Sequence, residues 1–251
     1  MASAEELKIR SDRVLPSLGP VYQFDDRRRR ELIGTSVFFE YESRHFVLSA
    51  RHVLIRDQPV HVGGDTTTIP LGGRFFHSGA ACNRSVEYDL AFFPLTNEQV
   101  AALPGVAFVT IGAVESDLPA AASVCYAAGF LIRDFRHPTA NQELKVEGTA
   151  IAATVAGVDK YVALGASADT HVLLAFDRLA TYSAPGRMEP TPKLHGMSGA
   201  GVWRFDDGSP TRDKLVAILI EHHQQDHKVI VATRVSEFFR SLDDYLAGRL
   251  S

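Results

Sequence analysis

The sequence has few cysteines and no strong excess of charge of either sign. Its 251 residues include only Cys82 and Cys125, which lie too far apart for a zinc knuckle or a redox pair. Two cysteines also do not make a disulfide framework, so we expect reduced thiols, as in a cytoplasm. The formal net charge of -4 gives no reason to expect nucleic acid as a partner. The short basic run at 27–30 follows Asp25 and Asp26 and is interpreted as a solvated loop.

Long hydrophobic runs are also missing. No apolar stretch has the length of a membrane-spanning helix, and the N-terminal sequence MASAEELKIRSDRVLPSLGP lacks the apolar core of a signal peptide. We therefore expect a soluble, cytoplasmic protein without a membrane partner. Nucleotide chemistry has no support either, because the chain contains no Walker Gly-Lys-Ser/Thr motif and no strand followed by Gly-x-Gly-x-x-Gly.

What the chain does contain is a series of short segments that resemble β-strands. Hydrophobic residues make up 45% and charged residues 22%, as in folded globular proteins. The segments are rich in β-branched and aromatic residues and are bounded by Gly, Pro, Asn or Asp, which predicts a many-stranded antiparallel sandwich or barrel. The predicted strands are 35–41, 45–49, 90–94, 106–111, 124–127, 146–152, 171–176, 201–205, 215–221 and 229–232.

One helix and one connector complete the predicted organisation. Apolar residues at helical spacing predict a helix at 236–247, with Ser236 as its cap and Gly248 at its end. The small, Pro-containing segment 112–122 is typical of a connector between two strand-rich halves. No repeat of fixed period occurs, so two barrels of similar size fit better than a solenoid or a propeller. We expect an N-terminal barrel at 1–115, a second barrel at 116–232 and a terminal helix within 233–251.

The stretch HGMSGAGVW at 195–203 places Ser198 between two glycines. A serine hydroxyl becomes a strong nucleophile only when a base lies within reach and backbone N–H groups stabilise the developing oxyanion. Gly196 and Gly199 permit the backbone angles that turn such N–H groups inward. The pattern Gly-x-Ser-Gly also occurs in many ordinary turns, so these residues alone do not identify a nucleophile.

Two further segments contain a base and a carboxylate. In FVLSARHVLI, His52 follows a hydrophobic strand at the point where the chain should turn. In EYDLAFFPL, Asp89 directly precedes an apolar strand, where a buried carboxylate needs a partner such as an imidazole. Singly, His52 also fits a hydrogen-bonded structural histidine, and Asp89 fits a turn cap. The order His52, Asp89, Ser198, with separations of 37 and 109 residues, gives the three more weight together.

This combination resembles the trypsin-like serine proteases of the chymotrypsin fold, in particular their intracellular bacterial members. Residues 49–53, Ser-Ala-Arg-His-Val, are similar to the family's motif Thr-x-x-His-Val, and 89–92, Asp-Leu-Ala-Phe, are similar to its aspartate motif. Residues 196–201, Gly-Met-Ser-Gly-Ala-Gly, are similar to Gly-Asp/Asn-Ser-Gly-Gly-Pro. The strand 34–41 is similar to the one that leads to the family's histidine, and the resemblance covers the chain from about residue 15 onward.

The resemblance implies an all-β fold of two six-stranded antiparallel Greek-key barrels with a C-terminal helix. It also implies an endopeptidase that works through an acyl-enzyme and needs no cofactor. Ser198 would be the nucleophile, His52 the general base and Asp89 the group that orients the imidazole. The N–H groups of Gly196 and Ser198 would form the oxyanion hole.

Three departures from the family pattern carry information. Val53 replaces the cysteine that forms a disulfide in secreted members, which agrees with a reducing compartment. Met197 replaces the acidic residue that pairs with a new N-terminal amine after zymogen cleavage, so activation by that route is not expected. Ala200 and Gly201 replace the second glycine and the proline of the serine motif, which leaves the geometry of the oxyanion hole open.

The resemblance also indicates where a protein or peptide substrate would bind. The walls of its primary pocket would be formed by 190–195 and 217–222, and a preference for basic side chains depends on whether Glu189 or Glu221 points inward. A small cytoplasmic protease also needs control, so a dedicated regulatory partner protein is a further hypothesis. The candidate substrate-binding residues are Lys193, His195, Ala217, Ile218, Leu219 and Glu221.

Two alternatives stay open. The histidines of EHHQQDH at 221–227 could hold a catalytic metal, but His222 and His223 are adjacent and would point to opposite faces of a strand. No His-Glu-x-x-His pattern supplies a converging pair, so a hairpin loop without metal fits better. The other alternative is a protease-fold protein that has lost activity and serves as a binding or scaffold module, although all three triad residue types are present.

Overall fold

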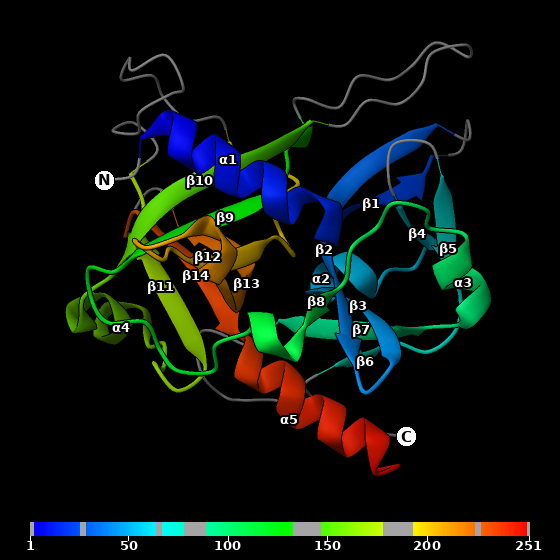
Figure 1. The fold of residues 1–251 in the computed structure, drawn as a ribbon. Coiled ribbons are helices and arrows are strands. Elements are labelled where there is room, and N and C mark those ends of the chain that lie inside the picture. Colours follow the sequence, from blue (N-terminus) through cyan, green and yellow to red (C-terminus); the bar gives the residue numbers. More distant parts are fainter. Residues whose placement is uncertain are drawn as a thin grey trace.

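The computed structural model describes residues 3–25, 29–63, 67–77, 89–132, 147–177, 193–223 and 227–249. Two strand systems lie side by side, and a helix at the C-terminal end runs beneath both of them (Figure 1). The first system comes from the N-terminal half of the chain and the second from the C-terminal half, with residues 111–123 between them.

The first strand system is an eight-stranded sheet with the order β5-β4-β1-β2-β3-β7-β6, and β8 pairs with β2. Its neighbours are antiparallel except β8, which is parallel to β2. The edge strands β5 and β6 do not pair with each other among the described residues, so the expected closure is not seen there. The strands are β1 (Leu18–Phe24), β2 (Arg30–Tyr41), β3 (Arg44–Ala50), β4 (Val60–Gly63), β5 (Thr68–Leu71), β6 (Phe76–His77), β7 (Leu90–Leu95) and β8 (Val109–Thr110).

The second strand system is a closed barrel with the order β10-β11-β14-β13-β12-β9. Its six strands confirm that a barrel forms in the C-terminal half. Alternate residues point inward, so Val172 and Leu174 of one strand share a core cluster with Ile230 and Ala232 of the next. The strands are β9 (Val124–Phe130), β10 (Gly148–Val155), β11 (His171–Ala175), β12 (Gly201–Arg204), β13 (Lys214–His223) and β14 (Val229–Arg234).

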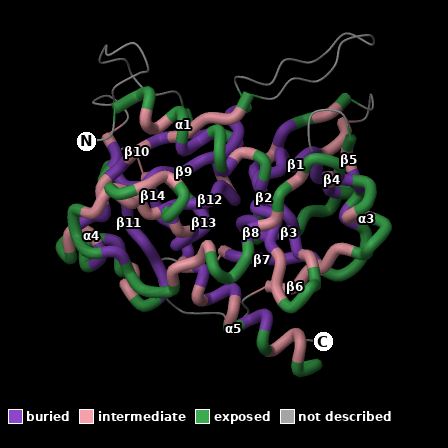
Figure 2. Tube along the Cα trace, in the orientation of Figure 1, coloured by how far each residue is buried: buried purple, intermediate pink, exposed green. Residues whose placement is uncertain are grey.

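All the predicted strands overlap strands of the structure, but one of them is much shorter than expected. Of the segment 106–111, only Val109–Thr110 forms β8, and a 3-10 helix begins at Ile111. The predicted strand at 146–152 starts at a residue outside the described part, and β10 begins at Gly148. Buried residues concentrate in the strands, and exposed residues lie mostly in the loops and the short helices (Figure 2).

The predicted C-terminal helix is confirmed as α5 (Val235–Leu246). The Phe238 ring is fully buried and meets the rings of Phe39 and Phe92 edge-on, at centroid distances of 5.1 and 5.4 Å. A buried phenylalanine stabilises a fold by about 2 kcal/mol or more, so these contacts fasten the end of the chain to the first sheet. The predicted cap is wrong, because the N-cap is Arg234 and no side chain caps the helix. Gly248, with a φ of 70°, follows the end of the helix as expected.

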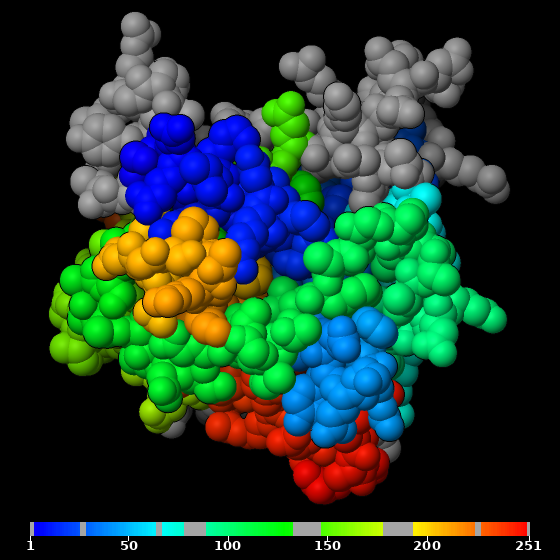
Figure 3. Space-filling view, viewed as in Figure 1, coloured from blue at the N-terminus to red at the C-terminus, as the bar shows by residue number. Residues whose placement is uncertain are grey.

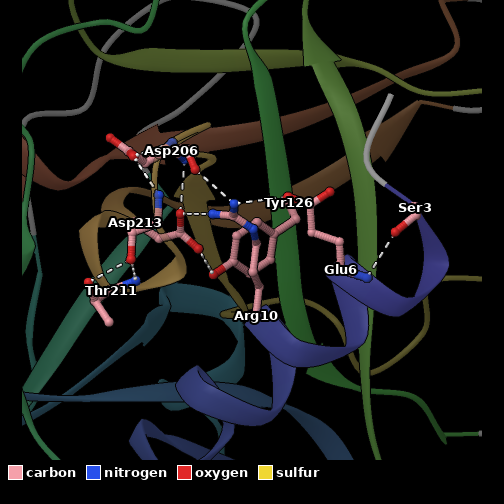
Figure 4. A network of polar contacts seen from close by, with 9 residues as sticks. Ser3, Glu6, Arg10, Tyr126, Asp206, Thr211 and Asp213 are labelled. Carbon is pink, nitrogen blue, oxygen red and sulfur yellow. Dashed lines mark hydrogen bonds and ion pairs between the residues drawn. The ribbon is translucent and has the colours of Figure 1, made fainter.

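The sequence did not predict the N-terminal helix α1 (Ala4–Val14), which lies along β9 and β10 of the barrel (Figure 1). Residues 1–115 were assigned to the first unit, yet this helix packs on the second. Arg10 is buried, forms an ion pair with Asp213 and lies 3.5 Å from the centre of the Phe205 ring (Figure 4). The remaining α-helices are short: α2 (Arg51–Leu54), α3 (Asn97–Ala101) and α4 (Val158–Leu164).

The N-terminal helix and the segment that joins β12 to β13 also lie against each other on the molecular surface (Figure 3). A hydrogen bond of 2.7 Å joins the Arg10 guanidinium to the backbone carbonyl of Asp206 in that segment. The Tyr126 hydroxyl of β9 donates to Asp213 at 3.0 Å. Burial and the neighbouring Asp213 carboxylate raise the pKa of the Tyr126 phenol, which therefore stays protonated and donates this bond.

Candidate active site

The structure brings together His52 and Asp89, which are 37 residues apart in the sequence. The strands β3 and β7 run antiparallel, and Ala50 at the end of one faces Leu90 at the start of the other. Arg51 N then donates to Asp89 O at 3.1 Å. The Asp89 carboxylate accepts a bond of 2.9 Å from the backbone N–H of His52, and its other oxygen bonds the ring nitrogen Nδ1 of His52.

This pairing fixes how the imidazole of His52 can act. A carboxylate only accepts hydrogen bonds, so the bond to Asp89 assigns the proton of the neutral ring to Nδ1 and leaves a lone pair on Nε2. The side chain of His52 is 46% exposed and that of Asp89 is 24% exposed. Nε2 can therefore accept a proton from a group that approaches from solvent, while Asp89 holds the ring from the protein side.

Ser198 lies in a turn whose glycines cannot be replaced without a clash. Gly196 has a φ of 95° and Gly199 a φ of 88°, in the left-handed region that favours glycine. A Cβ atom at Gly196 would lie 2.6 Å from the Phe130 carbonyl oxygen, and one at Gly199 would lie 1.9 Å from the Thr35 carbonyl oxygen. The two glycines thus permit both the shape of the turn and its close contact with neighbouring backbone.

Each backbone carbonyl from His195 to Ser198 accepts a hydrogen bond. Ile132 N donates to His195 O at 2.9 Å, and the Thr35 hydroxyl donates to Gly196 O at 2.8 Å. Ala200 N donates to Met197 O, and Thr35 N donates to Ser198 O, both at 2.8 Å. Four successive peptide carbonyls are thereby fixed in direction, so the orientation of each peptide plane in the turn is set.

The N–H groups of the same turn behave differently. Met197 N donates to Leu194 O at 2.9 Å, and Gly199 N donates to Leu219 O at 2.7 Å. In the described part of the chain, the N–H groups of Gly196 and Ser198 have no acceptor. These are the two N–H groups that the resemblance assigns to an oxyanion hole.

The turn and the histidine segment meet at Gly34 of β2. A Cβ atom at Gly34 would lie 2.5 Å from a methyl carbon of Val53, the residue after His52, and 2.9 Å from Ser198 O. The serine turn therefore lies beside α2, the short helix that contains His52. Across the described ranges, no hydrogen bond joins the Ser198 hydroxyl to His52, so the His52–Asp89 pair is formed and the third contact is not.

The sequence analysis missed two groups that hold the turn. Thr35 is fully buried in β2, and Ser49 is fully buried near the end of β3. The Ser49 hydroxyl donates to Thr35 O at 2.6 Å. Both lie within predicted strands, and Ser49 also begins the histidine motif at 49–53, but no sequence pattern shows the hydrogen bonds that they make.

The candidate substrate-binding residues divide into exposed and buried groups. Lys193 and His195 are exposed and directly precede the serine turn. Glu221 is also exposed, and its carboxylate lies 3.1 Å from His223 Nε2. Residues 217–219 are buried at 0 to 2% exposure and pair with the neighbouring strands, so they are not open to a substrate in this structure. Residues 189–192 lie outside the described part. The residues that fall in this buried group are Ala217, Ile218 and Leu219.

The histidine-rich segment shows no metal site in its described part. His222 packs its ring against Phe176 at a centroid distance of 5.4 Å, and His223 lies beside His227 at 6.2 Å. Residues 224–226 lie outside the described part. Over the described ranges, no group of three or more His, Cys, Asp or Glu side chains is arranged to hold a metal ion.

Other sequence predictions concern the thiols and the basic run. Cys125 is a free, buried thiol, and burial raises its pKa to about 12. Cys82 lies outside the described residues. Only the last two arginines of the basic run are described, and Arg29 binds the Asp25 carboxylate at 2.7 Å. That ion pair fits the interpretation of a solvated loop.

Comparisons with known proteins add no relative. No protein-family model matches the chain, and no curated protein matches it either. None of the helices in the described ranges is both long and apolar enough to cross a membrane.

Proposed function

We propose that the protein is a serine endopeptidase of the trypsin-like type, in which His52, Asp89 and Ser198 form a catalytic triad. The observation that carries the proposal is the double hydrogen bond from His52 to the Asp89 carboxylate, which leaves Nε2 of the ring as a base. The serine turn adds support, since two of its N–H groups, those of Gly196 and Ser198, have no acceptor among the described residues. In this proposal the first sheet is a second Greek-key barrel, and the site lies between the two units.

The reaction follows from these groups. Ser198 Oγ attacks the carbonyl carbon of the scissile peptide, and Nε2 of His52 takes the hydroxyl proton. The oxyanion that forms accepts hydrogen bonds from the N–H groups of Gly196 and Ser198, each worth about 3 kcal/mol in the transition state. The imidazolium, stabilised by Asp89, then gives its proton to the leaving amine. Water hydrolyses the acyl-enzyme by the same proton transfers in reverse order.

The substrate belongs to the proposal as well. A protein or peptide chain would lie across the exposed residues Lys193, His195 and Glu221. We propose a reducing compartment such as the cytoplasm as its setting, because Cys125 is a free thiol. A regulatory partner protein stays part of the hypothesis.

A binding or scaffold module without activity is the second candidate. The observation in its favour is that no hydrogen bond connects Ser198 to His52 in the described part of the structure. In free enzymes such catalytic hydrogen bonds are often long and shorten only when substrate binds. We therefore prefer the enzyme and make the inactive module an outcome of the test.

The test uses a fluorophosphonate probe, which reacts with an activated serine hydroxyl, together with a mixture of peptides as substrate. We expect the probe to label Ser198 in the wild type, as located by mass spectrometry, and peptides to be cleaved. Ser198→Ala should lose both labelling and cleavage while its circular dichroism stays unchanged. Folded wild type that neither reacts nor cleaves would instead identify a binding module.

A further inference from the structure

Thr35 connects the two units at the serine turn through both its backbone and its side chain. It lies in β2 of the first sheet, yet its N–H donates to Ser198 O at 2.8 Å and its hydroxyl donates to Gly196 O at 2.8 Å. The same hydroxyl accepts a bond of 3.0 Å from Phe130 N at the end of β9. One fully buried side chain therefore holds the serine turn, β9 and β2 together.

The bond to Gly196 O acts on the peptide group between Gly196 and Met197. Met197 N is bound to Leu194 O, so the Thr35 hydroxyl fixes the other side of the same peptide plane. Without that hydroxyl, Gly196 O and Phe130 N would each lose a buried hydrogen bond. A shift of the turn could reduce the free-energy penalty of leaving these groups unpaired. Such a shift would move the N–H of Gly196, which has no acceptor among the described residues and whose peptide group is held through the bond from Ile132 N to His195 O.

We propose that the Thr35 hydroxyl is a positioning group of the active site, which sets the direction of the Gly196 and Ser198 N–H groups from the opposite unit. This inference rests on the proposed function, because those N–H groups matter for catalysis only if they bind an oxyanion. The hydroxyl does not contact the reacting atoms. It acts through the backbone of the turn.

Ser36 provides a matched control. It is the next residue of β2, it is fully buried, and its hydroxyl donates to the Gly19 carbonyl at 3.0 Å. Removal of this hydroxyl also breaks one buried hydrogen bond to a backbone carbonyl, but that bond lies within the first sheet and away from the serine turn. Thr35→Val and Ser36→Ala therefore differ mainly in whether the serine turn is affected.

The experiment measures kcat, KM and urea denaturation for the wild type, Thr35→Val, Thr35→Ser and Ser36→Ala. We expect Thr35→Val to lower kcat by about 10 to 100-fold with KM changed less than about threefold, because the turn binds the transition state better than the substrate. Thr35→Ser keeps the hydroxyl and should restore kcat to within about threefold of the wild type. Ser36→Ala should keep the wild-type kcat. Equal kcat losses in Thr35→Val and Ser36→Ala, or no rescue by Thr35→Ser, would overturn the inference.

A second measurement separates this inference from the proposed function. Wild type without any Ser198-dependent hydrolysis would refute the protease, and amide hydrogen exchange then decides the role of Thr35. We expect the N–H groups of Met197 and Gly199 to lose protection in Thr35→Val and to keep it in Ser36→Ala. Unchanged protection in Thr35→Val would show that the hydroxyl does not position the turn.

Discussion

Arg10 and Asp213 form an ion pair in which each side chain is only 1% exposed, although 203 residues separate them in the sequence. Removal of one partner from a buried pair leaves an uncompensated charge and costs about 3 to 5 kcal/mol. We expect Arg10→Met to lower the free energy of unfolding by about 3 kcal/mol, as measured by urea denaturation. Arg13→Met is the control, because Arg13 lies in the same helix and makes only an exposed bond to Thr211. A similar loss in both variants would contradict this prediction.

The close packing of the serine turn predicts a large difference between two glycine substitutions. Gly199 and Gly105 both have positive φ, 88° and 81°, but a Cβ atom at Gly199 would clash with Thr35 O and one at Gly105 would meet nothing within 4 Å. Gly105→Ala should cost only the strain of the left-handed conformation, about 1 kcal/mol. Gly199→Ala should cost about 3 kcal/mol or prevent folding, because the turn must move away from β2. Thermal denaturation of the two variants measures the difference, and equal Tm values would refute the clash.

The pairing of His52 with Asp89 predicts a loss of activity without a loss of fold. In Asp89→Asn the side-chain amide can present a donor to Nδ1, which places the ring proton on Nε2 and removes the base. We expect kcat for peptide hydrolysis to fall by about 10⁴-fold. Nitrogen-15 chemical shifts of the His52 ring should report the changed tautomer. Asp117→Asn, at an exposed carboxylate of the connector, should leave both kcat and the ring shifts unchanged.

The carboxyl group of Glu237 in α5 predicts a pH dependence of stability. Its side chain is 4% exposed, and burial raises its pKa above the usual 4.5, while Arg240 partly offsets that shift. A raised pKa in the folded state means that the group stabilises the fold most at pH below 4.5, and that this contribution is lost as the pH rises through the folded-state value. Glu237→Gln stays neutral at every pH. Its free energy of unfolding should therefore rise relative to that of the wild type as the pH increases from about 4.5 to about 7.5. A difference that stays constant over this range would refute the raised pKa.

Ten of the strands and the C-terminal helix could be predicted because their patterns are local, whereas β1, β4, β5 and β6 were not predicted. Short continuous apolar runs mark β3 and β13, and the helical spacing of residues such as Phe238 and Leu242 marks α5. The N-terminal helix was missed because its most buried side chain is Arg10, which counts as polar in any hydrophobic pattern. Its burial is explained by Asp213 and Phe205, whose positions depend on the folded barrel.

The site was predictable to a similar extent. His52 and Asp89 could be paired from their places beside two apolar strands, since antiparallel neighbours bring such ends together. Whether the N–H groups of Gly196 and Ser198 find an acceptor depends on which carbonyl groups lie next to the turn in the folded chain. No sequence pattern records those pairings. Thr35 was not predicted for the same reason, because its bond to Gly196 O forms only in the folded chain.

The link between Thr35 and Gly196 spans 161 residues of chain, and it bears on when the proposed enzyme becomes active during its own synthesis. A nascent chain that has released only its first half holds the histidine and the aspartate but has not yet made the nucleophile. Hydrolysis must wait until the last strands are made and the serine turn has docked on β2. In this proposal, a chain that ends before the serine turn would lack the nucleophile and therefore the activity.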